Sequence, residues 1–249
     1  MRAERLSFAA TVPPWVRDEH AARFRFSAQF VAGKKVVDCA AGALIGSSGF
    51  ASAGAKRVIA IDRSILALAD APSSNALASL LIVPIGGDAM RLPLHSQSAD
   101  VFISLETIEH LDDARMYLGE VHRVLRPDGR FICSTPNRAV TNPGTTISDP
   151  PFNRFHVREY DEEQFASLLR QYFGHVELFA QNPQNRLNRW IADGVARAST
   201  RAAVLFRQTM KMSGFFIPNH DRHEVRPIAP GVSYEYLVAV CAAPKGSAR

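Results

Sequence analysis

Short apolar runs alternate with helical patterns through the first two-thirds of this chain of 249 residues. Five of the runs have the length of a β-strand and lie at residues 35–38, 57–62, 80–83, 100–105 and 130–134. Parallel strands joined through helices are buried on both faces, so they read as continuous apolar segments. The alternation therefore predicts an α/β fold in which helices cover both faces of a parallel, doubly wound sheet.

The clearest helix is predicted between the fourth and fifth strands. Asp112 or Asp113 is its expected N-cap, and the segment 126–129, Arg-Pro-Asp-Gly, is its expected stop. The residues expected to face inward from it are Met116, Leu118, Val121, Val124 and Leu125. Further helices are predicted at residues 47–53, 64–71 and 161–173.

The last third of the chain is organised differently. Two final strands are expected over 175–180 and 234–242, and residues 181–231 between them form an insertion too long for a plain loop. Residues 186–211 of this insertion have helical spacing and contain five arginines. This pattern predicts a helical lid or substrate element or, alternatively, a homo-oligomerisation arm. We expect one domain spanning residues 1–249.

Composition excludes few classes of partner. A hydrophobic share of 47% is ordinary for a globular domain, and the net charge of +5 permits nucleic acid without indicating it. Cys39, Cys133 and Cys241 stand singly, so buried reduced thiols are expected and a zinc ribbon or disulfide framework is not. Because no signal-peptide core and no run of about 18 apolar residues is present, we expect a cytoplasmic protein without a membrane span.

A cluster of potential ligands follows the fourth strand, in Glu106-Thr107-Ile108-Glu109-His110. Open α/β sheets bind ligands at the carboxyl ends of their strands. If the chain turns helically after Leu105, then Glu106, Glu109 and His110 lie at i, i+3 and i+4 and share one face. The segment then predicts a site for one ion or one substrate, and the alternative is a solvated acidic turn before a helix.

Three loops at the same edge of the predicted sheet suit a nucleoside. The turn from Asp38 to Gly42 is built of small residues, which let the backbone approach a ligand. Asp62 closes the second strand, where nucleotide-binding sheets hold a ribose, although capping the next helix is its alternative role. Asp88 and Ala89 follow the third strand and can bind adenine through a carboxylate and a backbone N–H. The G-x-G-x-x-G fingerprint of dinucleotide sites is absent.

The chain here resembles the class I S-adenosylmethionine-dependent methyltransferases, over roughly residues 19–180 plus the last strand. The segments that carry the resemblance are Val37-Asp38-Cys39-Ala40-Ala41-Gly42, Ala60-Ile61-Asp62, Gly87-Asp88-Ala89-Met90-Arg91-Leu92-Pro93, Ile103-Ser104-Leu105-Glu106-Thr107-Ile108-Glu109-His110 and Arg123-Val124-Leu125-Arg126-Pro127-Asp128-Gly129. The resemblance implies a Rossmann-like, seven-stranded, mostly parallel sheet with a helical insertion before the last strand. It also implies that residues 1–34 form a helical cap that closes over the cofactor.

The same resemblance implies which residues bind S-adenosylmethionine. Asp38 and Gly42 would lie beside its methionine part, Asp62 would hold its ribose, and Asp88 with Ala89 would hold its adenine. The remaining implied cofactor contacts are Arg23, Arg63 and Leu105.

The chain departs from the family at Leu44, where a second glycine is usual. A branched side chain at this position predicts crowding of the cofactor or a different path for the loop. It also motivates an alternative from another class, a protein that binds S-adenosylmethionine without turnover.

The Glu-x-x-Glu-His segment resembles the metal-binding motif of ubiquinone-biosynthesis O-methyltransferases and of small-RNA 2′-O-methyltransferases. In the latter, a further histidine arrives after Thr-Pro-Asn, which matches Thr135-Pro136-Asn137 followed by His156 in this chain. The implied ligands of a divalent ion such as Mg²⁺ are therefore Glu106, Glu109, His110 and His156. A similar pairing of segments occurs in methyltransferases of glycan and lipopolysaccharide biosynthesis.

A divalent ion would activate a hydroxyl acceptor and orient it, which favours O-methylation of a sugar-containing or polyhydroxylated small molecule. We expect Glu106, His110 and His156 to act in catalysis. A metal-free mechanism is the alternative, with His110 or His156 as general base oriented by a glutamate. For His156, the alternative role is that of a hydrogen-bonded histidine in a loop. For the methyl acceptor, the alternatives are an RNA ribose and a quinone precursor.

Overall fold

The computed structural model describes residues 14–69, 81–184, 194 and 223–244. The elements of the first half are α1 (Pro14–Ala28), β1 (Lys35–Cys39), α2 (Ile45–Ser52), β2 (Arg57–Asp62), α3 (Ile65–Ala69), β3 (Ile82–Gly86), β4 (Ala99–Leu105) and the 3₁₀ turn η1 (Ile108–His110). Those of the second half are α5 (Ala114–Val124), β5 (Leu125–Pro136), α6 (Arg138–Thr141), α7 (Glu162–Arg170), β6 (Phe173–Pro183), β7 (Arg226–Pro227) and β8 (Tyr234–Pro244).

The strands form one sheet in the order β3-β2-β1-β4-β5-β8-β6-β7. Strands β1 to β5 pair in parallel, while β8 runs antiparallel to both β5 and β6. The predicted mostly parallel α/β sheet is confirmed. The sheet has one strand more than the seven expected, because the two residues of β7 pair with Phe179 and Ala180 of β6.

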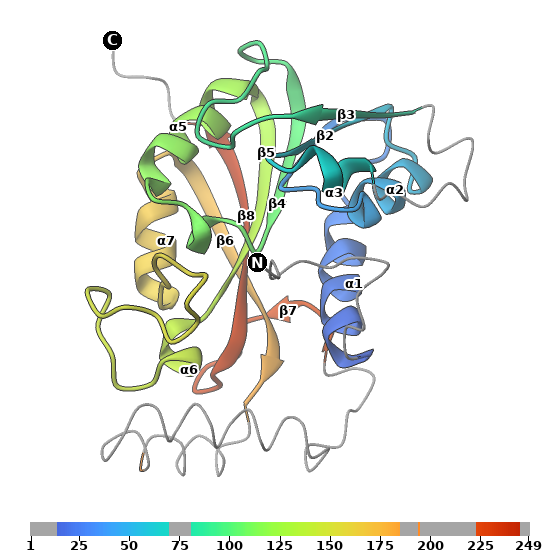
Figure 1. Cartoon of the computed structure of the whole chain (residues 1–249). Helices are drawn as coiled ribbons and strands as arrows, with labels where there is room; N and C mark the ends of the chain where they lie inside the picture. Colours follow the sequence, from blue (N-terminus) through green and yellow to red (C-terminus); the bar gives the residue numbers. More distant parts are fainter. Residues whose placement is uncertain (1–13, 70–80, 185–193, 195–222, 245–249) are drawn as a thin grey trace.

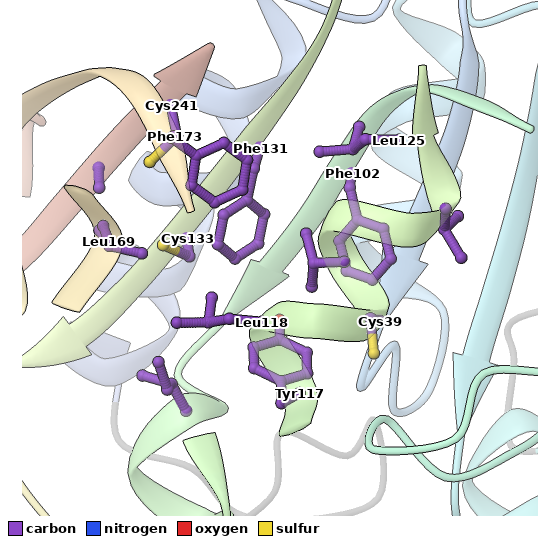
Figure 2. Close-up of a cluster of buried hydrophobic side chains, with 14 of the residues drawn as sticks. Cys39, Phe102, Tyr117, Leu118, Leu125, Phe131, Cys133, Leu169, Phe173 and Cys241 are labelled. Atoms are coloured by element: carbon purple, nitrogen blue, oxygen red, sulfur yellow. The ribbon is translucent and has the colours of Figure 1, made fainter. Parts of the chain in front are cut away.

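Helices cover both faces of the sheet, with α5 and α7 on one side and α1, α2 and α3 on the other (Figure 1). The larger core lies under α5 and α7, where the rings of Phe131 and Phe173 stack with their centroids 5.6 Å apart (Figure 2). Tyr117 and Leu118 of α5 are fully buried in this core. Cys39, Cys133 and Cys241 are buried free thiols, as expected.

The expectation for Met116 was wrong, since 56% of this residue is exposed. The helix begins after Asp113, whose carboxylate accepts from the backbone N–H groups of Arg115 and Met116. Its buried residues, Tyr117, Leu118, Val121 and Val124, follow helical spacing, and position 116 is turned about 100° from position 117. The strand after it is also longer than predicted, because Leu125 already pairs with Ala99 before an irregularity at 126–129.

The predicted insertion is described only at its two ends. Strand β6 continues to Pro183, beyond the predicted boundary at residue 180, and β7 lies near the other end. The proposed helical element at 186–211 falls outside the described residues, apart from Gly194. No helix among the described residues has the length and apolar character needed to cross a membrane.

Candidate active site

The loop between β1 and α2 has an unusual backbone. Ala40, Gly42 and Leu44 all have positive φ angles, of 62°, 54° and 59°. A Cβ built on Gly42 would meet no described atom within 4 Å, so open space lies beside this part of the backbone. This is the loop that the sequence assigned to the methionine part of the cofactor, and its bare backbone suits close approach by a ligand.

Leu44 takes the left-handed conformation that a glycine would adopt. The conformation costs about 1–2 kcal/mol for a residue with a Cβ. The side chain offsets part of this cost, because it is 6% exposed and packs in a small cluster with Ala60 and Leu68. The loop backbone therefore has the conformation that a glycine at position 44 would take, while the leucine side chain packs in the core.

Asp38 lies at the end of β1 and is 5% exposed. Its Oδ2 accepts a hydrogen bond of 2.6 Å from the Ser47 hydroxyl. Burial, with the nearby Asp62 adding to it and the Ser47 bond opposing it, raises the pKa of Asp38 to about 7. The carboxyl group at the start of the cofactor loop thus changes charge near neutral pH.

Asp62 links the first two loops. Its Oδ2 accepts from the backbone N–H of Gly42 at 2.9 Å, and its Oδ1 accepts from that of Ser64 at 2.7 Å. The carboxylate therefore caps the turn before α3, which is one of the two roles considered for this residue, and its contact with a ribose stays a prediction.

The other implied cofactor contacts lie on either side of this loop. Asp88 holds its own turn, its Oδ1 accepting from Met90 N at 2.9 Å, and the half-buried Ala89 packs against the main core. Leu105 is half-buried at the end of β4, whereas Arg63 is exposed.

Arg23 of α1 is 1% exposed, and its guanidinium lies near Glu106 and the Tyr236 ring. Its guanidinium lies 4.5 Å from the centroid of the Tyr236 ring and donates from Nη1 to Gln181 at 2.5 Å. Its Nε is 4.0 Å from Glu106 Oε1, yet neither Nε nor Nη2 has a hydrogen-bond partner among the described residues. Unpaired buried N–H groups are costly, so this guanidinium is a candidate for an anionic ligand group.

Glu106 does not lie on the helical turn that the sequence predicted. Its φ of 52° places it in the left-handed region, and the 3₁₀ turn begins only at Ile108. Its backbone N–H is held by Ser134, whose hydroxyl also donates to Glu106 Oε1 at 2.6 Å. The expected i, i+3, i+4 arrangement was wrong for this residue, because β5 fixes its backbone before the helical turn starts.

Glu109 is fully buried beneath the site. Its Oε2 accepts from the Thr135 hydroxyl at 3.1 Å, while its Oε1 has no hydrogen-bond partner among the described residues. Burial, reinforced by the carboxylate of Glu106, raises the pKa of Glu109 well above its usual value. A buried carboxylate oxygen without a donor is unfavourable unless a cation or a proton compensates it.

His110 and His156 meet above this carboxylate. Their ring centroids are 4.7 Å apart, and Nε2 of His110 lies 4.0 Å from Glu109 Oε1. Glu109, His110 and His156 each offer one ligand atom, and these atoms lie within 4.8 Å of one another. The structure thus brings together three of the four predicted metal ligands. Glu106 lies outside this group, so its ligand role stays a prediction.

The segment that carries His156 is tied directly to the 3₁₀ turn. The Glu109 carbonyl accepts from the N–H groups of Val157 and Arg158, and Nδ1 of His110 lies 2.9 Å from the Phe155 carbonyl oxygen. These contacts join residues about 45 positions apart in the chain and fix the two histidines relative to each other.

Sequence reasoning missed several residues that hold the cluster. Ser134 and Thr135 bind Glu106 and Glu109, and Glu159 lies 2.6 Å from Nδ1 of His156. Ser134 ends the fifth predicted strand and Thr135 begins the Thr-Pro-Asn segment quoted above, but neither was given a role of its own. For Glu159, the available signal was its position three residues after a candidate ligand.

Comparison with known proteins finds similarity to methyltransferases. Residues 37–133 match the family model described as a methyltransferase domain. A protein of Mycolicibacterium smegmatis, named a probable S-adenosylmethionine-dependent methyltransferase, is 35% identical over 156 residues, which are 62% of this chain and 57% of that protein. A ubiquinone/menaquinone biosynthesis C-methyltransferase of Caulobacter vibrioides is 44% identical over 57 residues, 23% of each protein.

The fold is shared with solved methyltransferases. The S-adenosylmethionine-dependent methyltransferase from Mesorhizobium loti superposes with a TM-score of 0.58 at 17% identity, covering 90% of this chain and 99% of that chain. The chain thus has the α/β fold of these methyltransferases, and its residues 37–133 match the model of a methyltransferase domain. It spans a little over half, 57%, of the length of the M. smegmatis relative.

Proposed function

We propose that this protein is an S-adenosylmethionine-dependent O-methyltransferase that acts on a hydroxyl of a sugar-containing or polyhydroxylated small molecule, assisted by a divalent metal. The observation that carries the metal part is the buried Glu109 carboxylate, whose Oε1 has no hydrogen-bond partner among the described residues and faces two imidazoles. One carboxylate with two imidazoles is a donor set that suits Mn, Fe, Co or Zn and is less typical of Mg.

The cofactor end of the site has features that fit S-adenosylmethionine. The open space beside Gly42 admits a ligand against the backbone, and Asp62 ends β2, where nucleotide-binding sheets hold a ribose. Nε and Nη2 of Arg23 have no hydrogen-bond partner within the described ranges, so they suit a carboxylate. When bound, the cofactor supplies an electrophilic methyl group on sulfur.

The acceptor end is assigned to the group of Glu109, His110 and His156. A divalent ion held there would supply Lewis-acid polarisation of a hydroxyl acceptor and a template for it. In this proposal Glu109 provides the negative charge, and the two histidines provide neutral nitrogen ligands. Glu106 lies between Arg23 and Ser134, so it connects the cofactor end to the acceptor end and can orient the acceptor.

A small diol, catechol or sugar suits this arrangement better than an isolated alcohol. Three protein ligands leave coordination positions open, and two neighbouring hydroxyls can fill two of them. Fixing the reacting hydroxyl in this way contributes several kcal/mol to the barrier reduction.

The first experiment separates cofactor binding from metal use. Calorimetric titration of the full chain with S-adenosylhomocysteine should give a dissociation constant in the micromolar range, and titration with Mn²⁺ should reveal one site. Methyl transfer from radiolabelled S-adenosylmethionine to a panel of catechols and glycosides should then be stimulated by Mn²⁺ and lost in EDTA. Absence of S-adenosylhomocysteine binding at millimolar ligand would reject both the enzyme and a non-catalytic S-adenosylmethionine-binding protein.

Two variants and one control refine this test. His110→Ala and Glu109→Gln should abolish Mn²⁺ binding and metal-stimulated transfer while they change S-adenosylhomocysteine affinity less than threefold. His95→Ala is the control, because His95 is exposed on a loop before β4. Full activity in excess EDTA would instead support the metal-free alternative, in which His110 or His156 acts as general base.

A quinone precursor is the second candidate acceptor. It is favoured by the similarity to the C. vibrioides protein, which is named for ubiquinone and menaquinone biosynthesis. A catechol-type quinone precursor also carries two neighbouring oxygens, so a soluble analogue belongs in the same panel. Methylation at carbon, detected by mass spectrometry and NMR of the product, would reject O-methylation while leaving methyl transfer itself intact.

A further inference from the structure

We propose that Glu159 is a positioning residue that fixes the tautomer of His156, and that it thereby makes Nε2 the working nitrogen of this histidine. The inference rests on the proposed function, because it assumes that His156 acts as a ligand or base. Glu159 is 2% exposed and lies on the segment before α7, outside the Glu-x-x-Glu-His motif. It belongs to no set of ligands described above.

The evidence on the Nδ1 side of the ring is a short contact. Nδ1 of His156 lies 2.6 Å from Glu159 Oε1. A carboxylate can only accept, so a carboxylate at Glu159 requires the proton on Nδ1. A metal-binding histidine commonly donates its second ring N–H to a carboxylate in this way, which fixes the ring and leaves the other nitrogen as the ligand.

The evidence on the Nε2 side is independent. Asn153 Nδ2 lies 3.0 Å from His156 Nε2, and Asn153 Oδ1 accepts from the Phe155 N–H at 3.1 Å. The backbone N–H of Phe155 fixes which end of the amide is oxygen, so the nitrogen end points at the histidine. An amide nitrogen can only donate, and Nε2 must therefore be the acceptor. Both sides of the ring give the same tautomer.

The orientation of the Glu159 carboxylate is also fixed. Its Oε2 accepts from the Thr141 hydroxyl and from Asn142 Nδ2, the latter at 2.7 Å. Asn142 cannot turn around, because its Oδ1 accepts from the Phe152 N–H at 2.6 Å. Two donors therefore meet Oε2, and only Oε1 is available to the histidine.

This geometry predicts the effect of a single-atom change. In Glu159→Gln, the amide oxygen would take the Oε2 position, where two donors point, and the NH₂ group would face His156. That NH₂ would donate to Nδ1 and drive the ring proton to Nε2, which removes the lone pair from the site. In the double variant Glu159→Gln with Asn142→Asp, the new carboxylate would accept from the glutamine NH₂. The glutamine oxygen would then turn toward Nδ1 and restore the original tautomer.

The decisive measurement is the tautomer itself. Long-range ¹H–¹⁵N correlation spectra of the full-length, metal-free chain at pH 8 report which ring nitrogen is protonated, and the His156 signals are assigned by their loss in His156→Gln. We expect Nδ1–H in the unmodified chain, Nε2–H in Glu159→Gln and Nδ1–H again in the double variant. The proposal is overturned if the unmodified chain is Nε2–H, if Glu159→Gln keeps Nδ1–H, or if the double variant does not revert.

Metal binding provides the functional readout. With Mn²⁺ as the probe, Glu159→Gln should weaken binding about 10- to 100-fold, the double variant should recover most of it, and S-adenosylhomocysteine affinity should stay within twofold. Glu163→Gln is the matched control, since the Glu163 side chain is 86% exposed. If the unmodified chain binds no Mn²⁺, the metal part of the proposed function fails, while the spectra still decide the role of Glu159.

Discussion

The two ends of the site are built by different means. At the cofactor end, the loops after β1 and β2 lie within a segment of about 25 residues. They combine small residues, positive φ angles and acidic residues at the ends of the strands. At the acceptor end, side chains from η1, the end of β5 and the segment before α7 meet around the buried Glu109. The cofactor end is built from neighbouring residues, so it can be predicted from the sequence. The acceptor end depends on packing between distant segments, so its residues can be mutated without changing the cofactor end.

The largest effect is expected from pH at the cofactor end. Because the folded pKa of Asp38 is raised to about 7, this group binds more protons in the folded chain than in the unfolded chain between about pH 4 and pH 7. The contribution of Asp38 to the free energy of unfolding should therefore fall as pH rises through this window and level off above it. The share of Asp38 is at most about 4 kcal/mol, since one pKa unit corresponds to about 1.4 kcal/mol.

Urea unfolding at pH 5 and pH 7.5 measures this share when it is compared with Asp38→Asn. Asparagine keeps an oxygen for Ser47 and cannot ionise, so the variant should lose less stability than the unmodified chain over this range. Equal losses in both proteins would show that Asp38 ionises normally in the fold.

The next effect concerns the independence of the two ends. Asp62→Ala removes the acceptor for the Gly42 and Ser64 N–H groups as well as the expected ribose contact. We expect S-adenosylhomocysteine affinity to fall about 100-fold, roughly 2.7 kcal/mol, with Mn²⁺ affinity unchanged. Asp128→Ala is the control because the Asp128 side chain is 85% exposed. Equal loss of both ligands would mean that the two ends fold and bind as one unit.

A third prediction concerns the contact between α1 and the cofactor loop. A Cβ on Gly46 would lie 2.6 Å from the Phe24 ring and 3.3 Å from Asp38 Oδ2. Gly46→Ala should therefore destabilise the chain by about 2 kcal/mol, the range for an overpacked site, and lower the melting temperature by several degrees. Phe24→Leu in the same chain should recover part of the loss. If Phe24→Leu recovers no stability, the steric conflict of the added methyl group lies with Asp38 and not with Phe24.

The smallest effect is expected at Leu44. Leu44→Gly removes a buried side chain but also relieves the left-handed backbone, so the change in unfolding free energy should stay below about 2 kcal/mol. Affinity for S-adenosylhomocysteine should change less than threefold, because the leucine packs into the core. A tenfold or greater gain in affinity would show that the leucine does crowd the cofactor. Such crowding was the reason for considering a protein that binds S-adenosylmethionine without turnover.

The errors of prediction follow the same division. Strands β1, β2 and β4 were placed from their apolar runs to within one residue at each end, because their burial pattern is local. Met116 was assigned to the wrong face of α5. A short helix can be rotated about its axis and still present a similar apolar face, so only packing selects Tyr117 as the inward residue. Glu106 was assigned helical geometry, and its true conformation depends on Ser134 of the neighbouring strand.

The amino-acid sequence by itself determined the α/β class, and it predicted the cofactor loops and three side chains that the structure brings together, Glu109, His110 and His156. These features depend on periodicity and on motifs confined to short segments. Only the tertiary structure decided that Glu109 is buried with one oxygen unpartnered by any described residue, that Glu106 turns toward Arg23, and that Glu159 contacts His156. Hydrogen bonds between segments distant in the chain set side-chain orientation and tautomer, and no local pattern records them.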